Sequence, residues 1–125
     1  MLERIFLGLT ALMYFAFGGW SLIDPVGMTT QLGTTIGGES GVFEMRGIYG
    51  GVSLGGALLC SLAAFSADFR RAGLAFIAAY MGGYVIGRSA SFFAGDTAGF
   101  SNWAFAGFEA VMFVAALLLL MRPQK

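Results

Sequence analysis

The sequence predicts an all-α fold, a bundle of four transmembrane helices with both termini in the cytoplasm. Hydrophobic residues make up 58% of the 125 residues and charged residues only 11%, and a soluble domain of this length could not bury so much apolar surface. The apolar residues also fall into four segments, each close to the roughly 20 residues that cross a hydrocarbon core. Most lysines and arginines gather outside these segments, on one predicted side of the membrane. Residues 1–125 are therefore expected to form a single integral membrane domain.

The predicted spans are residues 5–23, 44–66, 72–94 and 101–121. The first follows a charged start, but no small-x-small cleavage site precedes the next polar segment, so we expect a retained span rather than a signal peptide. The third span carries Arg88 and the fourth carries Glu109, whereas the first has no charged residue. Glu44 and Arg46 open the second span, so four charged side chains are predicted in the outer half of the membrane.

A short helix is predicted between the first two spans. Asp24 suits the N-cap position and Pro25 suits the first helical position, and we expect this helix to lie on the membrane surface. Gly37 and Gly38 are expected to let the chain turn back into the bilayer. The later connections are short, so the helices that they join are expected to be antiparallel neighbours.

The positive charges predict the orientation of the spans. Five of the seven basic residues fall on the side that the two termini share with the loop between the second and third spans, namely Arg4, Arg70, Arg71, Arg122 and Lys125. The loops on the opposite side contain no lysine or arginine. Because basic residues in short loops stay in the cytoplasm, both termini are predicted to be cytoplasmic. The predicted location is the bacterial inner membrane.

Small residues recur at fourfold spacing in two spans. They are Gly47, Gly51 and Gly55 in the second span and Ala79, Gly83, Gly87 and Ser91 in the third. Such stripes let helix backbones approach closely in lipid. We expect them to pack inside the bundle, with the face of a homodimer or of a larger membrane complex as the alternative.

The composition argues against several classes of function. The chain has no histidine and one cysteine, so the usual haem, zinc and di-iron ligands and a dithiol pair within one chain are missing. A hydrolase triad cannot be assembled without histidine. The net charge is zero and no basic run is present, which argues against nucleic acid as a partner. We expect no cofactor and no enzymatic activity.

Arg88 and Glu109 are predicted to form a bidentate ion pair between the third and fourth spans. An unpaired charge in the middle of a membrane helix costs from about 3 kcal/mol upward, so each side chain needs a partner. Side chains lean toward the N-terminus of their helix. Since the two spans run in opposite directions, Arg88 and Glu109 lean toward each other. The pair is expected to hold the spans together, either as its only role or as part of a ligand site.

A polar, aromatic-lined cavity open to the outer side is predicted around this pair. Three polar residues open the second span from that side, and a tyrosine and an asparagine share helix faces with the paired charges. The predicted ligand-binding residues are Glu44, Arg46, Tyr49, Tyr84, Arg88, Asn102 and Glu109.

The same residues carry a resemblance to a known family. An E-x-R-x-x-Y-G-G motif opens the second span, a Gly-Arg pair lies late in the third and a glutamate lies within the fourth. These residues are Glu44, Arg46, Tyr49, Gly50, Gly51, Gly87, Arg88 and Glu109. In these motifs the chain resembles the small bacterial membrane-protein family known as domain of unknown function 4345. The resemblance implies a four-helix inner-membrane bundle and brings no activity with it.

Two functions fit this sequence. The first is a non-enzymatic membrane protein that binds a lipid headgroup or another small amphipathic or anionic ligand through the outer-leaflet Arg/Glu pocket, or that serves as an accessory subunit. The alternative is a small dimeric proton-coupled transporter in which Glu109 gains and loses the proton. Small multidrug exporters carry their membrane glutamate in the first span, which has no charged residue here. That difference favours the binding protein.

Overall fold

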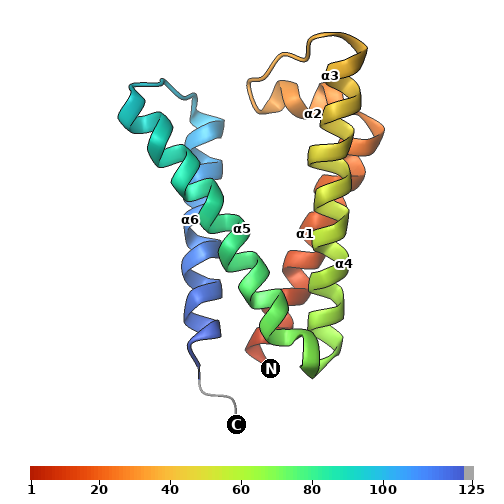
Figure 1. The fold of residues 1–125 in the computed structure, drawn as a ribbon, viewed down its shortest axis with the longest axis vertical. Coiled ribbons are helices and arrows are strands. Elements are labelled where there is room, and N and C mark those ends of the chain that lie inside the picture. The colour runs from red at the N-terminus through yellow and green to blue at the C-terminus, as the bar shows by residue number, and fades with distance from the viewer. Residues whose placement is uncertain (123–125) are drawn as a thin grey trace. The chain divides into compact units, whose positions relative to one another are not determined.

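The computed structural model describes residues 1–122, which form helices and no strand. In chain order the elements are α1 (Leu2–Ile23), α2 (Pro25–Gln31), α3 (Gly38–Met45), the π-helix η1 (Arg46–Gly51), α4 (Val52–Phe65), α5 (Ala67–Ala94) and α6 (Phe100–Leu120) (Figure 1). The segments α3, η1 and α4 follow one another without a break and form one continuous helix, Gly38–Phe65. The all-α prediction is confirmed. Lys125, one of the residues used to predict the orientation, lies outside the described residues.

Within residues 1–122, three helices, rather than the four predicted, are long and apolar enough to cross a membrane. They are α1, the continuous helix Gly38–Phe65, and α6. The helix α5 has 28 residues, so its length is sufficient, but its second half contains three glycines, Tyr84 and Arg88. These residues lower its mean hydropathy. The chain therefore has the helices of a membrane protein, and three of the four predicted spans are confirmed by length and composition.

The chain divides into two compact units, with the boundary inside α5 after Arg70. In the first unit, the helix Gly38–Phe65 packs along α1 (Figure 1). Contacts between these two helices join Arg4 to Ala64, Phe17 to Tyr49 and Leu22 to Arg46. Residue numbers rise along one helix as they fall along the other, so the two helices are antiparallel.

The second unit begins at Arg71 and pairs α5 with α6. Its contacts join Arg71 to Leu120, Arg88 to Glu109 and Phe92 to Trp103. These pairs again run in opposite directions along the two helices. The predicted antiparallel arrangement of the third and fourth spans is confirmed.

Two glycines lie where α1 meets η1. A Cβ atom on Gly18 would lie 3.1 Å from the carbonyl oxygen of Gly50, and a Cβ atom on Gly50 would lie 2.5 Å from Cδ2 of Leu22. At separations this short, a side chain at Gly18 would require Gly50 or Leu54 to move by a few tenths of an ångström, and one at Gly50 would displace the side chain of Leu22. The close approach of the two backbones therefore depends on glycine at both positions, as small residues allow in membrane helices.

The glycine stripe predicted in the second span does not mark this contact. Among the described residues, a Cβ atom on Gly47 or Gly55 would meet nothing within 4 Å, and one on Gly51 would meet only the carbonyl oxygen of Arg46 in its own helix. The π-helix η1 accounts for this, because its hydrogen bonds span one residue more than those of an α-helix. Residues on either side of η1 are therefore rotated relative to the regular fourfold pattern, and Gly50 faces α1 instead.

The stripe predicted in the third span is displaced by one residue. A Cβ atom on Gly82 would lie 2.9 Å from the ring of Phe113 in α6, whereas Gly83 and Gly87 face open space among the described residues. Gly82 and Gly83 are neighbours in the sequence and lie on adjacent helix faces. Their spacing alone could not show which of them contacts α6.

The connection between α1 and α3 matches its prediction. Asp24 Oδ1 accepts a hydrogen bond from the backbone N–H of Gly27 over 2.9 Å, which caps α2, and Pro25 is its first residue. Gly38 has a φ of +66°, a left-handed conformation that glycine adopts readily, at the start of α3. The short helix and the turn back into the next long helix are both confirmed.

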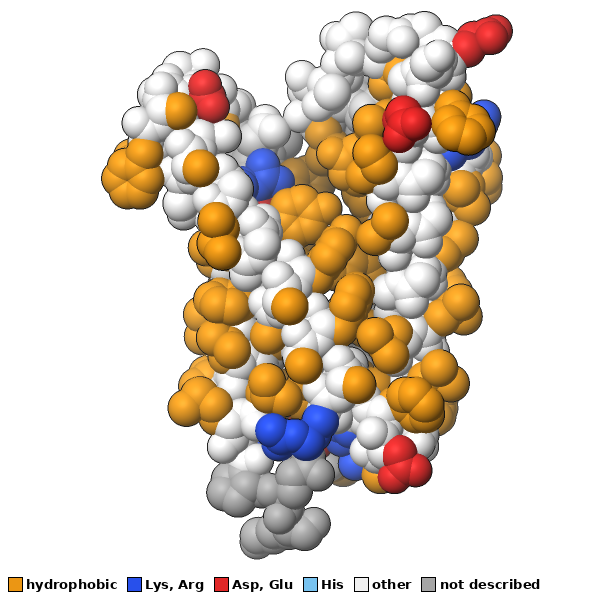
Figure 2. All heavy atoms as spheres, in the orientation of Figure 1, with side chains coloured by type: hydrophobic (Ala, Val, Ile, Leu, Met, Phe, Trp, Pro, Cys, Tyr) orange, Lys and Arg blue, Asp and Glu red, His pale blue; other side chains and the backbone are white. Residues whose placement is uncertain are grey.

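Large apolar side chains remain exposed over much of the protein surface. Examples with at least half of their surface exposed are Leu9, Leu12, Leu58, Ile86, Val111 and Leu118. Figure 2 shows hydrophobic side chains over the middle of each unit and most charged side chains nearer its ends. Exposed apolar area on this scale is costly in water but not in lipid. The surface supports the assignment as a membrane protein.

Candidate functional site

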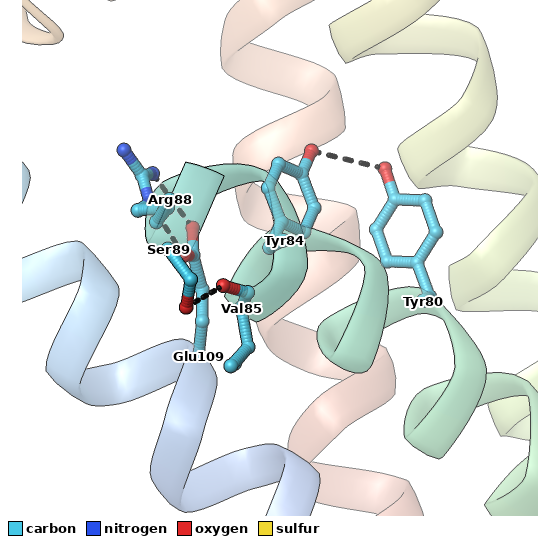
Figure 3. A network of polar contacts seen from close by, with 6 residues as sticks. All are labelled: Tyr80, Tyr84, Val85, Arg88, Ser89 and Glu109. Atoms are coloured by element: carbon cyan, nitrogen blue, oxygen red, sulfur yellow. Dashed lines mark hydrogen bonds and ion pairs between the residues drawn. The ribbon is translucent and has the colours of Figure 1, made fainter. Parts of the chain in front are cut away.

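Arg88 and Glu109 form the bidentate ion pair that the sequence predicts. Arg88 Nε lies 2.7 Å from Glu109 Oε2, and Arg88 Nη2 lies 2.8 Å from Glu109 Oε1. Figure 3 shows the guanidinium group of α5 facing the carboxylate of α6. Parallel N–H to oxygen bonds of this kind are the strongest arrangement open to an arginine and a carboxylate.

Burial makes the pairing of Glu109 necessary. Glu109 is only 7% exposed, so its carboxylate has little access to solvent and would be costly without a partner. The Arg88 side chain is 35% exposed, so the arginine reaches this carboxylate from a more open position. Both carboxylate oxygens accept hydrogen bonds from the guanidinium. The geometry is that of a clamp between two helices, with its charges balanced.

The tyrosines of α5 form a ladder beside this pair. The Tyr80 and Tyr84 hydroxyls lie 3.3 Å apart, and their rings meet edge to face with centroids 5.2 Å apart. Tyr80 also stacks on Phe76. In Figure 3 the two hydroxyls point toward each other, while the Arg88 guanidinium points toward Glu109.

Asn102 lies at the start of α6, where the sequence places it. It occupies the first turn of α6, seven residues before Glu109, which corresponds to roughly 10 Å along the helix axis. The two side chains therefore share a stripe of α6 at different depths. Asn102 belongs to the end of the helix, whereas Glu109 lies within it.

Arg46 of the first unit makes a contact that the sequence does not reveal. It is exposed, as expected for a side chain that leans outward, but its Nε donates a hydrogen bond to the carbonyl oxygen of Leu22 over 3.1 Å. Leu22 lies in the last turn of α1, where carbonyl groups have no partner inside the helix. Arg46 therefore caps α1.

Arg4 and Arg71 cap helices in the same way. Arg4 Nε donates to the carbonyl oxygen of Ala64 near the end of α4 over 3.1 Å, and Arg71 Nη1 donates to that of Leu120 at the end of α6 over 3.4 Å. A cation at a helix C-terminus also interacts favourably with the helix dipole. Sequence reasoning used these arginines only for orientation. The sequence did offer a signal for these caps, because Arg4 and Arg71 each lie opposite the predicted C-terminal end of an antiparallel partner helix.

A hollow opens beside Arg46 within the first unit. It has a volume of about 920 Å³ and is formed by α2, the segment before α3, α3 and the start of η1. Its lining residues are Val26, Ile36, Gly38, Glu39, Val42, Phe43, Arg46 and Gly47. The wall is thus mainly apolar, with one guanidinium and one carboxylate, a composition typical of ligand sites. Of these residues, the sequence identified only Arg46 as a ligand-binding residue.

The other predicted residues of the first unit lie outside this hollow. Glu44 is exposed and is not among the lining residues. Tyr49 is partly buried and meets the ring of Phe17 edge to face, with centroids 6.1 Å apart. The seven predicted residues are therefore divided between the units. A single cavity that combines both sets stays a prediction.

Within residues 1–122, no group of three or more His, Cys, Asp and Glu side chains is placed to hold a metal ion.

A family model described as Domain of unknown function (DUF4345) matches residues 2–120. No curated protein and no solved structure matches the chain. The family predicted from the sequence motifs is confirmed over nearly the whole chain.

Proposed function

Since the chain belongs to the family of domain of unknown function DUF4345, which brings no activity with it, we propose a function from the geometry of the site. The protein is a multi-pass membrane protein that binds a phospholipid of the outer leaflet in the hollow beside Arg46, through the anionic phosphate group of the lipid. The observation that carries this proposal is the combination of an exposed guanidinium and an apolar wall in one open hollow.

Arg46 can bind a phosphate while it caps α1. Its Nε is engaged by Leu22, but within residues 1–122 its two Nη groups have no protein partner. A guanidinium binds phosphate oxygens through pairs of N–H donors. The bond to Leu22 also fixes the side chain in place, which lowers the entropy lost when a ligand binds.

The apolar lining suits the hydrocarbon part of such a ligand. Val26, Ile36, Val42 and Phe43 line the hollow together with Arg46, and Phe43 is among the exposed large hydrophobic residues. An acyl chain or glycerol backbone laid against these side chains would cover them. The hollow thus offers separate places for a headgroup and for the start of an acyl chain.

The proposal includes a four-span topology in a bacterial inner membrane. The helix α5 acts as the remaining span, because Glu109 neutralises the charge of Arg88, the single charged residue of residues 72–94. Both termini lie in the cytoplasm, and the hollow then opens to the outer side. The lack of basic residues in residues 24–39 and 95–100 supports this orientation.

The Arg88–Glu109 pair serves in this proposal as a structural clamp rather than as the ligand site. Both carboxylate oxygens are engaged by the guanidinium, which leaves the pair without net charge to attract an anion. A proton-coupled transport role for Glu109 and an enzymatic activity form no part of the proposal.

The test compares the lipids that stay bound to the purified protein. The full chain is extracted in mild detergent, and the retained phospholipid is quantified by native mass spectrometry. Replacing Arg46 removes a charge-assisted contact of about 1.5–3 kcal/mol, so Arg46→Gln is expected to lower retention about tenfold or more, whereas Arg46→Lys should lose less.

Arg4→Gln is the matched control, because Arg4 caps Ala64 with the same 3.1 Å bond but lies outside the hollow. Its lipid retention should equal that of the unchanged protein. Equal retention by the Arg46→Gln protein, with its helical circular dichroism intact, would refute the proposal. A tightly copurifying protein in place of lipid would favour the role of accessory subunit instead.

A further inference from the structure

Glu39 gives the hollow a second charge of opposite sign. It lies in the first turn of α3 and lines the hollow together with Arg46. Within residues 1–122 neither Glu39 nor Arg46 forms an ion pair, either with the other or with a third residue. The proposed phosphate contact uses only Arg46, so the carboxylate needs a separate explanation.

The spacing of the two charges keeps them apart on one helix face. Glu39 and Arg46 are seven residues apart, and the residues between them are α-helical because η1 begins only at Arg46. Seven residues make about two turns, or roughly 10 Å along the axis, and bring both positions to the same face. The long Arg46 side chain leans toward the helix N-terminus and hence toward Glu39. The hollow therefore has the Glu39 carboxylate on one side of a gap and the Arg46 guanidinium on the other.

We infer that the ligand is a zwitterionic phospholipid with a primary ammonium group, of the phosphatidylethanolamine class. This inference rests on the proposed phospholipid site. The phosphate lies at Arg46 and the ammonium at Glu39, while the glycerol and acyl chains cover the apolar wall. A headgroup that is only anionic would satisfy Arg46 and repel Glu39.

The carboxylate also distinguishes among ammonium groups. A primary ammonium, like that of lysine, has three N–H donors for carboxylate oxygens, whereas the quaternary ammonium of phosphatidylcholine has none. The charge-assisted hydrogen bond therefore forms only with the primary ammonium. The expected order of affinity is phosphatidylethanolamine first, with phosphatidylcholine and phosphatidylglycerol behind it.

The experiment measures competition among lipids with identical acyl chains for the full chain in detergent micelles, by native mass spectrometry. Because Glu39 is exposed, its contribution is that of a surface ion pair, and we expect the unchanged protein to prefer phosphatidylethanolamine over phosphatidylglycerol by about twofold to fivefold. Glu39→Gln should abolish or invert this preference. Glu44→Gln, which removes the same charge from the same helix outside the hollow, should leave it unchanged.

The outcomes separate this inference from the site on which it rests. A preference that persists in Glu39→Gln, or a preference for phosphatidylglycerol in the unchanged protein, overturns the inference while Arg46-dependent binding still stands. Binding of all lipids that is insensitive to Arg46→Gln overturns the site itself. Glycerophosphoethanolamine, which lacks acyl chains, should compete at least about tenfold more weakly, and equal competition would overturn the assignment to a lipid.

Discussion

Removing one partner of the Arg88–Glu109 pair is expected to destabilise the second unit far more than removing both. Arg88→Leu leaves the carboxylate of Glu109, a residue only 7% exposed, without its two hydrogen bonds of 2.7 and 2.8 Å. Charge-assisted bonds contribute about 1.5–3 kcal/mol each, and an unpaired charge within a membrane helix costs about 3 kcal/mol or more. Arg88 is 35% exposed, which places the expected loss at the lower end, about 2–4 kcal/mol.

The double variant Arg88→Leu/Glu109→Leu removes both charges and leaves neither unpaired. Apolar replacement of a whole buried pair is often neutral or stabilising, so we expect its free energy of unfolding to lie within about 1 kcal/mol of the unchanged protein. The assay is equilibrium unfolding of the full chain in mixed detergent micelles, followed by circular dichroism. Ser89→Ala, at the neighbouring exposed position of α5, is the control and should change stability by less than about 0.5 kcal/mol. If the double variant is as unstable as the sum of the two single variants, the pair is not a clamp.

Two further predictions concern the packing and the orientation of the helices. Gly18→Leu should cost about 1–3 kcal/mol in the same unfolding assay, because its side chain would collide with Gly50 and Leu54. The control Gly19→Leu meets open space among the described residues and should be neutral or stabilising. Equal effects of the two substitutions would show that α1 and η1 do not meet as described. A green fluorescent protein fused to the C-terminus should fluoresce and an alkaline phosphatase fused there should be inactive, and the reverse result would invalidate the predicted topology.

The Arg88–Glu109 pair could be predicted from the sequence because a few local rules determine it. Burial depth follows from position in the span, side-chain lean follows from helix direction, and the cost of an isolated charge demands a partner. The N-cap at Asp24 and the turn at Gly38 are local in the same sense. The cap and the turn each depend on residues within a few positions along the chain, so the sequence alone is sufficient to predict them.

The hollow and the helix caps could not be predicted because they depend on how helices cross. Arg46 reaches Leu22 only where Gly18 and Gly50 let α1 approach η1. The π-helix itself has no distinctive sequence signal, yet it rotates the glycines that follow it. The place of Glu39 in the hollow depends on how α2 and α3 fold at the end of the first unit.

The two arginine caps of the first unit have a mechanical consequence for α1. Arg4 ties the start of α1 to the end of α4, and Arg46 ties the end of α1 to the start of η1. If α1 slid by one turn along its partner, both bonds would be lost at once and Gly18 would no longer oppose Gly50. The two hydrogen bonds, one at each end of α1, therefore oppose sliding of α1 along its partner helix and make the two helices behave as a rigid pair.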